Sequence, residues 1–392
     1  MSARRGWCPG VFDPMPTGDG LLVRVKPPLG MVSAEGALAL AEAALRFGNG
    51  TIEITRRGNL QVRGLSAEGA APFAAAMIGC GLALADAGAE RRRCVMVSPL
   101  IGDDPTLAPS AAALAEAIER GLNREPGFAA LPAKFCIAVD GGGVLPLRDV
   151  GADIAVRARD GGFAVSVEGE AAEIALHVRG FITQRVMPRL GTGIPGVGVA
   201  RGGVDGRTKS GRGDAPPIGF IGYDASRRGA FAIGIPFGTM QAPILRALGA
   251  LAVRDGDGRL RTTPWRTMVI GGVAERDAAQ VADSAAALGL IVAPDDRRLR
   301  IVTCPGSPAC SSATVPARAD GATIAQLLAG AGTIHVSGCR KGCAHPGPAV
   351  ITLVGDGGCY GIVRNGRASD ASATIGLTIG EAVARLRSEL AG

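Results

Sequence analysis

Two short stretches near the C-terminal end of the chain carry four cysteines: TCPGSPAC at residues 303–310 and SGCRKGC at residues 337–343. The cysteine spacing is C-x5-C and C-x3-C. Pro, Gly and Ser inside the first pair predict a tight loop that directs backbone N–H groups toward sulfur. The two cations inside the second pair would lower the thiol pKa values and offset negative charge. Thiolates are soft ligands, so the pattern favours an iron–sulfur or metal site over a disulfide framework.

Cys304, Cys310, Cys339 and Cys343 are therefore predicted to be the four thiolate ligands of an iron–sulfur cluster. A structural zinc site and four unconnected buried thiols are the alternatives. Paired zinc ligands usually have two to four residues between them, which does not match the first pair. Cys8, Cys80, Cys94 and Cys359 are expected to be ordinary small apolar residues.

Composition narrows the class of protein. The chain has 392 residues with 60 glycines, 25 prolines and 4% aromatic residues, which indicates many tight turns in a globular protein of two to four domains. Irregularly spaced cysteines, with neither a secretory leader nor an apolar run of about 18 residues, favour a cytoplasmic location and no membrane partner. The net charge of +7 is spread out and stacking aromatics are scarce, so an anionic small molecule is expected rather than nucleic acid.

The chain contains an internal repeat. A strand, helix and strand pattern over residues 21–81 returns over residues 230–271, and PLGM at residues 28–31 aligns with PFGT at residues 236–239. Thr55-Arg56-Arg57 falls where the second copy has Thr263-Pro264-Trp265. A hairpin pattern follows each copy, at residues 153–171 and 349–367, while residues 140–143 are expected to form a further hairpin turn. Ser33 is expected to cap a helix that runs to Phe47, and Ser66 to Gly81 are expected to form another helix.

This order predicts an α+β fold with duplicated ferredoxin-like halves plus two α/β domains in pseudo-twofold symmetry. The expected parts are an N-terminal arm (1–18), a first ferredoxin-like half (19–85), a first α/β domain (86–188), a Gly-rich linker (189–217), a second ferredoxin-like half (218–292) and a cluster-bearing α/β domain (293–392).

The cysteine spacing and the domain order resemble the sulfite and nitrite reductase superfamily over nearly the whole chain. The resemblance implies that the quartet holds a 4Fe–4S cluster beside a tetrapyrrole, where the domains meet. Residues 55–61 look like the superfamily's T-x-R-x-x-x-Q strand, which places Arg57 at the macrocycle. Residues 93–102 are similar to its R-N-x-x-x-x-P-L-A-G segment, and residues 131–136 to its L-P-R-K-F-K segment.

These three matches predict that Arg57, Arg93 and Lys134 are catalytic and bind a tetrapyrrole substrate or haem, with Arg91 and Arg92 assisting. The sequence departs from the superfamily at Cys136, where the reductases carry a second lysine. One cation that would polarise a small oxyanion is therefore missing.

The N-terminal stretch RGWCPG at residues 5–10, followed by Pro14 and the strand at residues 21–25, looks like the start of the precorrin-3B synthases, a branch of this superfamily. The resemblance implies a monooxygenase of cobalamin biosynthesis that uses dioxygen to hydroxylate precorrin-3A and to close a γ-lactone. An external electron donor, such as an NAD(P)H-linked reductase, would be its partner.

Two other functions stay open. The first is a sirohaem-dependent sulfite or nitrite reductase, in which Cys343 would also bridge cluster and haem iron. The second is a non-catalytic electron-transfer or tetrapyrrole-carrier protein. A mononuclear non-haem iron also remains open as a cofactor, but His177, His335 and His345, the three histidines of the chain, are not assigned to it.

Overall fold

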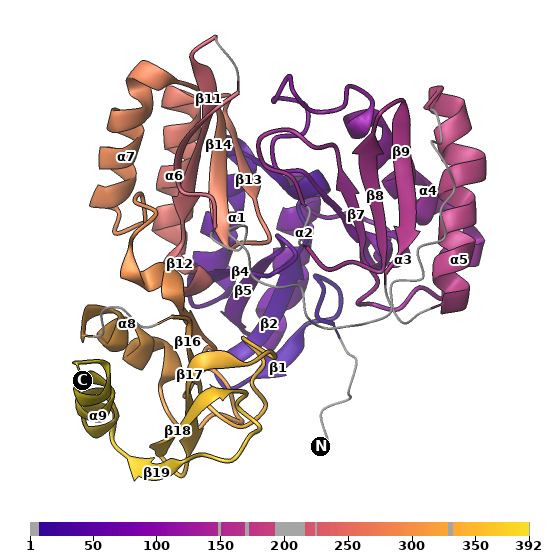
Figure 1. Cartoon of the computed structure of the whole chain (residues 1–392). Coiled ribbons are helices and arrows are strands. Elements are labelled where there is room, and N and C mark those ends of the chain that lie inside the picture. The colour runs from indigo at the N-terminus through magenta and orange to yellow at the C-terminus, as the bar shows by residue number, and fades with distance from the viewer. Residues whose placement is uncertain are drawn as a thin grey trace. The chain divides into compact units, whose positions relative to one another are not determined.

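The computed structural model describes residues 8–147, 150–168, 172–192, 216–223, 226–327 and 332–391. Four β-sheets with flanking helices make up these ranges (Figure 1). The chain forms two compact units, which are described separately. The larger unit comprises Met1–Met15, Leu22–Gly234 and Met240–Val292, and the smaller unit comprises Pro16–Leu21, Ile235–Thr239 and Ala293–Gly392.

The duplicated halves form two five-stranded sheets, with strand orders β1-β2-β5-β4-β12 and β10-β11-β14-β13-β3. The strands of the first sheet are β1 (Met15–Thr17), β2 (Gly20–Val25), β5 (Leu60–Leu65), β4 (Thr51–Ile54) and β12 (Thr239–Gln241). The strands of the second sheet are β10 (Gly219–Gly222), β11 (Arg228–Gly234), β14 (Thr267–Ala274), β13 (Arg259–Thr262) and β3 (Met31–Ser33).

Each half gives one short strand to the other half's sheet. β3 pairs antiparallel with β13, so that Val32 lies opposite Leu260, and β12 lies beside β4. A one-turn 3-10 helix precedes each exchanged strand, and both turns hold a non-glycine residue at positive φ: Leu29 at 48° and Phe237 at 57°. The repeat predicted from the sequence is therefore present, and this exchange interlocks its two copies.

Serine caps begin the first two helices, and the cap at Ser33 was predicted from the sequence. Ser33 precedes α1 (Ala34–Phe47), and its Oγ accepts a hydrogen bond of 3.0 Å from the Gly36 amide. Ser66 caps α2 (Ala67–Gly79) in the same way. Such a bond satisfies one of the N–H groups that the first turn of a helix leaves unpaired.

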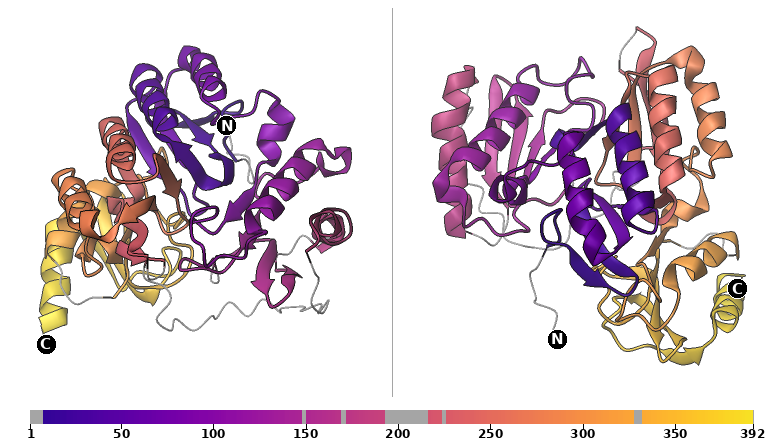
Figure 2. Two further views of the ribbon diagram at one scale, coloured as in Figure 1. Left: turned by 90° about the horizontal axis from the view of Figure 1, so that it is seen from above. Right: turned by 180° about the vertical axis from the view of Figure 1, so that it is seen from behind.

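The equivalent helices α1 and α6 (Ala242–Asp255) pack against each other, side by side in the views of Figure 2. Small residues permit the close approach, because a methyl group at Gly249 would lie 3.2 Å from the Ala37 methyl. α6 and α7 (Ala278–Ala287) both contact the second sheet (Figure 1).

The first α/β domain has a four-stranded sheet in the order β6-β7-β8-β9. Its strands are β6 (Val95–Val97), β7 (Ile137–Asp140), β8 (Ile154–Arg159) and β9 (Gly162–Val167), and its helices are α3 (Ala87–Arg92), α4 (Ala111–Arg124) and α5 (Ala172–Phe181). The first three strands are parallel, and β8 and β9 form the predicted hairpin. The apolar face of α4, including Leu114, Ile118 and Leu122, is fully buried in the core.

The smaller unit repeats this layout with the order β15-β16-β17-β18-β19. Its elements are β15 (Ile301–Thr303), α8 (Ala317–Leu327), β16 (Ile334–Ser337), β17 (Ala349–Asp356), β18 (Cys359–Gly366), β19 (Thr374–Leu377) and α9 (Ile379–Ala391). The first three strands are again parallel, and β17 and β18 form the second predicted hairpin. α8 and α9 flank this sheet (Figure 1).

Short helices complete the described chain. They are η1 (Pro28–Gly30), η2 (Pro126–Phe128), η4 (Met187–Leu190), η5 (Pro236–Gly238), η6 (Glu275–Asp277) and η7 (Arg297–Arg300), all of the 3-10 type, and the π-helix η3 (Ile182–Val186). In the described ranges no helix combines the length and apolarity needed to cross a bilayer.

One expectation from the sequence is wrong, and another concerns residues outside the described ranges. Residues 140–143 do not form a hairpin turn, because the strands on either side, β7 and β8, are parallel and the chain cannot reverse there. Most of the predicted linker, residues 193–215, lies outside the described residues. The fold class itself is confirmed as α+β with two ferredoxin-like halves and two α/β sheets.

Candidate active site and cysteine loops

A small pocket of about 30 Å³ in the larger unit gathers cationic side chains and thiols. Its polar and thiol-bearing lining residues are Cys8, Arg24, Lys26, Arg57, Asn59, Arg93, Cys94, Glu119 and Cys136. The structure thus brings Arg57, Arg93 and Cys136 together at one pocket. The exposed Lys134 lies between two lining residues, Ala133 and Phe135, but does not itself line the pocket.

A tight turn after β4 presents Arg57. The Thr55 hydroxyl accepts hydrogen bonds from the Arg57 amide at 3.3 Å and the Asn59 amide at 3.1 Å. Gly58, with φ of +66°, completes the turn, and its carbonyl accepts a hydrogen bond from the hydroxyl of Thr262 in the other half. Among the described residues, the Arg57 guanidinium has no hydrogen-bond or ion-pair partner, so it is available to an external anion.

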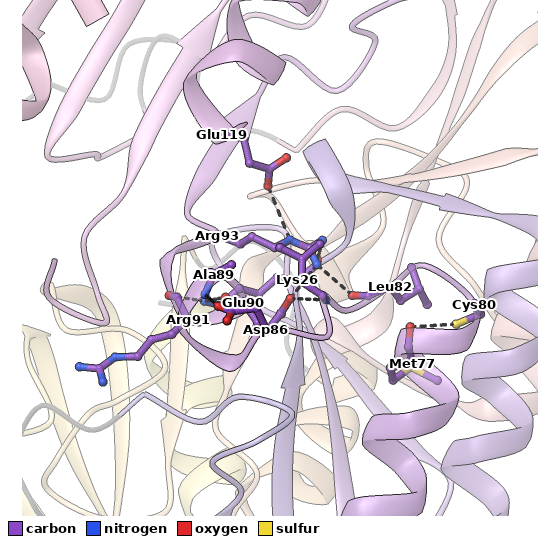
Figure 3. Close-up of polar contacts among 11 residues, drawn as sticks. Lys26, Met77, Cys80, Leu82, Asp86, Ala89, Glu90, Arg91, Arg93 and Glu119 are labelled. Atoms are coloured by element: carbon purple, nitrogen blue, oxygen red, sulfur yellow. Dashed lines mark hydrogen bonds and ion pairs between the residues drawn. The ribbon is translucent and has the colours of Figure 1, made fainter. Parts of the chain in front are cut away.

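Arg93 differs from Arg57 because its guanidinium is already bonded to the protein (Figure 3). It lies 2.8 Å from the Glu90 carboxylate and 3.6 Å from the Glu119 carboxylate, and it donates to the Lys26 carbonyl. Arg93 is only 4% exposed. The Arg93 guanidinium therefore links α3, α4 and the residue that follows β2, and it also lines the pocket.

Two pocket cations, Arg24 and Lys26, escaped the sequence analysis. Arg24 donates to the Gln61 side chain at 2.7 Å and to the Cys8 sulfur. The Lys26 ammonium donates to the backbone carbonyls of Glu90, at 3.1 Å, and Arg91. Burial lowers the pKa of both Arg24 and Lys26. The sequence signal that could have revealed them is the presence of charged residues at the end of the apolar run of β2.

Cys136 supplies a neutral wall beside Arg57. Burial raises the pKa of its thiol to about 11, while the Arg57 charge opposes that rise. Cys94 comes directly before β6, just as Cys136 comes directly before the parallel strand β7. Burial and the Cys136 thiol raise the pKa of Cys94 as well. Trp265 packs against the same cluster of buried residues. Cys94 matches the expectation of an uncharged residue, whereas Cys8 differs because it accepts a hydrogen bond.

Arg91 and Arg92, which were expected to assist, do not line this pocket. Arg92 donates to the carbonyls of Leu122 and Asn123 at the end of α4, and Arg91 extends away from the ion-pair network (Figure 3). His177 packs edge-on against Phe128, with ring centroids 5.4 Å apart. These contacts are structural ones.

The cysteine loops follow two adjacent parallel strands in the smaller unit. Cys304 comes directly after β15, and Cys339 follows β16, with Thr303 opposite Val336 in the register. The amide of Gly338 donates to the Cys304 sulfur at 3.1 Å. The sequence predicted such N–H donors inside the first loop, whereas this donor comes from the second loop. The two loops are also joined by Lys341, whose ammonium donates to the Ser312 hydroxyl at 2.8 Å.

Neighbouring thiols raise the pKa values of Cys304 and Cys343. Burial raises the pKa of Cys304, hydrogen bonds from the Gly338 and Gly306 amides lower it, and the charged forms of Cys310 and Cys339 raise it. Two thiolates interact in this way only when they lie close together.

Cys343 belongs to the same group. Its pKa is raised by burial and then by Cys339 and Cys310, and is lowered by Lys341. In the described part of the chain, no three Cys, His, Asp or Glu side chains are grouped as ligands of a metal ion. The neighbouring His335 is fully buried, and its ring packs edge-on against His345 at 5.6 Å.

Comparison with known proteins identifies the family. The model of the nitrite/sulfite reductase ferredoxin-like half domain matches twice, at residues 13–78 and 227–288. A precorrin-3B synthase from Sinorhizobium sp. is 34% identical over 393 residues, which cover 94% of this chain and 84% of the relative. The chain belongs to the precorrin-3B synthase family.

More distant relatives place that family among the reductases. A ferredoxin sulfite reductase of Mycolicibacterium paratuberculosis is 25% identical over 85% of this chain and 69% of its own length. The solved structure of the NirA protein of Mycobacterium tuberculosis superposes with a TM-score of 0.64 at 19% identity, covering 93% of this chain and 79% of that one. The latter likeness concerns the fold.

Proposed function

We propose that this protein is a precorrin-3B synthase: an oxidoreductase that hydroxylates precorrin-3A with dioxygen and closes a γ-lactone from an acetate side chain. The observation that carries the proposal is the pocket wall at Cys136, where a buried neutral thiol stands beside the unpartnered guanidinium of Arg57. A site for reducing a small oxyanion needs cations and proton donors there. A neutral wall suits a bulky macrocycle, which the family relationship favours as substrate.

Arg57 would bind a carboxylate of the substrate. Its turn is fixed by the Thr55 hydroxyl and by Gly58, so little conformational entropy is lost when an anion binds. A guanidinium fork matches a carboxylate with two parallel hydrogen bonds, which fixes the orientation as well as the position of the ring.

Arg93 and Lys134 complete the proposed substrate-binding set from different positions. Lys134 is exposed next to the pocket and can reach a second carboxylate. Arg93 contributes its charge from the buried network, where Glu90 and Glu119 hold it. The two carboxylates neutralise part of that charge, so Arg57 is expected to contribute more to substrate affinity than Arg93.

Cys304, Cys310, Cys339 and Cys343 would hold a 4Fe–4S cluster. Cys310 and Cys339 lie close enough to raise the pKa of both Cys304 and Cys343, and the Gly338 amide already points at the Cys304 sulfur. When bound, such a cluster supplies one-electron transfer.

The proposed reaction needs a reductant besides dioxygen. One oxygen atom enters the tetrapyrrole and the other leaves as water, which consumes two electrons and two protons. The electrons are proposed to come from an external donor, such as an NAD(P)H-linked reductase. The chain's own contribution is to hold the ring through its carboxylates and to place one uncharged wall, at Cys136, beside the ring carbon that reacts with oxygen.

A sirohaem-dependent sulfite or nitrite reductase is the second candidate, favoured by the sulfite reductase relatives at 25% identity. A tetrapyrrole carrier is the third, and it predicts binding without turnover. Anaerobic purification with iron, sulfide and pigment analysis separates the first two. The synthase is expected to show cluster absorption without a sirohaem Soret band and to convert precorrin-3A under oxygen, whereas a Soret band with sulfite or nitrite turnover would favour the reductase.

A further inference from the structure

A second cavity, which shares no lining residue with the first pocket, lies between α4 and the segment formed by η3 and η4 in the larger unit. Its volume is about 340 Å³, within the range of small-molecule sites. Four arginines line it: Arg120 and Arg124 on α4, Arg185 on η3 and Arg189 on η4. We infer that this cavity binds a small amphipathic polyanion, a molecule with two or more carboxylate or phosphate groups on an apolar body.

The arrangement of charge points to a ligand. Arg120 and Arg124 are four residues apart on α4, a spacing that brings like charges together on a helix and destabilises it. Glu125 is the acidic side chain that lines the cavity in the described residues, and it pairs with Arg185 at 2.9 Å. A net positive charge therefore remains.

Two of the four cations are unpartnered. Arg120 pairs with Glu116 at 3.2 Å. Arg124 and Arg189, both exposed, make no hydrogen bond or ion pair within the described ranges. Arg124 lines the cavity from α4 and Arg189 lines it from η4, so a ligand in the cavity meets an unpaired cation from each element. Each guanidinium can donate two parallel hydrogen bonds to a carboxylate or phosphate.

The floor of the cavity is apolar. Phe181 and Val186 are buried there, and a side chain at Gly121 would collide with the Phe181 ring, since its Cβ would lie 2.1 Å from Cζ. Gly121 thus lets the ring lie close to α4. The Arg185 guanidinium lies 5.7 Å from the centre of the same ring. A ligand with an apolar or planar body can rest on this floor while its anionic groups reach the arginines.

The backbone on one wall is unusual. η3 (Ile182–Val186) is a π-helix, a rare conformation that occurs mostly as single turns and frequently at functional sites. The wider turn follows α5 and is followed directly by the 3-10 turn η4. This sequence of turns places Phe181, Arg185 and Arg189 along the same cavity.

The inference does not rest on the proposed enzymatic function, and its test separates the two. Uroporphyrin, a tetrapyrrole polycarboxylate, and a fluorescent N-methylanthraniloyl derivative of ATP, an aromatic polyphosphate, are titrated into the full-length protein, and fluorescence is followed. Saturable binding of at least one probe is expected, and which probe binds tells whether carboxylates or phosphates are preferred.

The decisive variant is Arg124→Gln/Arg189→Gln, which is expected to bind that probe at least about tenfold more weakly, because two charge-assisted contacts are lost. Arg246→Gln/Arg276→Gln, which removes two exposed arginines on α6 and η6, should bind it like the wild type. Precorrin-3A turnover by Arg124→Gln/Arg189→Gln should stay at the wild-type rate, which distinguishes the cavity from the proposed active site. Thermal melting should show no loss of stability in the first variant, since like-charge repulsion is relieved.

Two results would overturn the inference. One is that neither probe binds saturably to the wild type. The other is that the Arg124→Gln/Arg189→Gln protein, folded by thermal melting, binds the probe as tightly as the wild type does.

Discussion

The two α/β sheets share one layout but differ at the same place, the loops that follow their first two strands. In the larger unit these loops contain Ser98, Asp104 and Asp140, each 5% exposed or less. In the smaller unit they contain the four cysteines. Three parallel strands and an antiparallel fourth thus support either polar loops or thiol loops.

The polar loops are closed by their own hydrogen bonds. The Ser98 hydroxyl accepts from the Gly141 amide at 3.0 Å, and Asp104 accepts from the Val144 amide and the Thr106 amide, both at 2.8 Å. These bonds satisfy donors that would be costly to bury unpaired.

The thiol loops leave more of their side chains available as ligands. Cys304 accepts an amide hydrogen bond from Gly338, and Cys343 is exposed. The difference teaches that the duplicated scaffold supplies strand ends, while the loop residues decide whether a loop stabilises itself or offers ligands.

The largest effect is expected from removing a thiol ligand. Cys339→Ser should lower cluster content and precorrin-3A turnover together, by about 100-fold or more, since a hydroxyl is a poor substitute for a soft thiolate. Iron, acid-labile sulfide and activity would be measured in anaerobically purified protein. Cys359→Ser, at a thiol outside both loops, is the matched control and should keep the cluster. One equivalent of zinc without sulfide in the wild type would contradict the assignment.

The next effect concerns the unpartnered pocket cation. Arg57→Ala should weaken precorrin-3A binding by about 1.5–3 kcal/mol, or roughly ten- to 150-fold, because a charge-assisted bond is lost. Equilibrium titration of the substrate measures this change. Arg56→Ala, at the exposed neighbour in the same turn, serves as the control. Equal affinity in the two variants would remove Arg57 from the site.

A smaller effect is expected in the polar loops. Asp104→Ala should lower the free energy of unfolding by about 1–3 kcal/mol, because the amides of Val144 and Thr106 lose their acceptor. Chemical denaturation measures it, with the exposed Asp160→Ala as control. Iron content should stay at the wild-type value. If Asp104→Ala lost the cluster instead, the two sets of loops could not be assigned to separate roles.

The smallest effect is a pH dependence at Cys136, whose thiol pKa is raised by burial from 9.0 to about 11. The unfolded chain loses this proton first, so its contribution to stability is complete below pH 9 and is lost as the pH rises toward 11. Between pH 8 and pH 10, the wild type should lose about 1 kcal/mol more unfolding free energy than Cys136→Ala. Denaturation at the two pH values tests this, and parallel losses would show that the thiol is not desolvated.

Local signals in the sequence were enough for several elements. Ser33 before an alanine-rich periodic run predicted a capped helix, and α1 has that cap. The aligned turns at residues 28–31 and 236–239 predicted the duplication. The exchange of β3 and β12 between sheets could not be predicted, because strand partners are set by packing over long distances in the sequence and not by local propensity.

The site was predicted unevenly for a similar reason. Arg57 and Cys136 were found through motifs, and they meet at one pocket. Arg24 and Lys26 were missed because an isolated charge at a strand end has no local signature. The ion pairs of Arg93 with Glu90 and Glu119 depend on how α3 and α4 pack, which the order of residues does not reveal. Domain boundaries and the roles of individual site residues remain predictions.

The central claim is that the neutral wall at Cys136 belongs to a site for oxidising a tetrapyrrole. The most direct measurement assays the wild type and Cys136→Lys with precorrin-3A under oxygen and, separately, with sulfite and nitrite and a chemical reductant. The wild type is expected to convert precorrin-3A with oxygen uptake and to leave both oxyanions unreduced, and Cys136→Lys is expected to lose that conversion. Reduction of sulfite or nitrite at enzymatic rates by the wild type, with precorrin-3A untouched, would contradict the account.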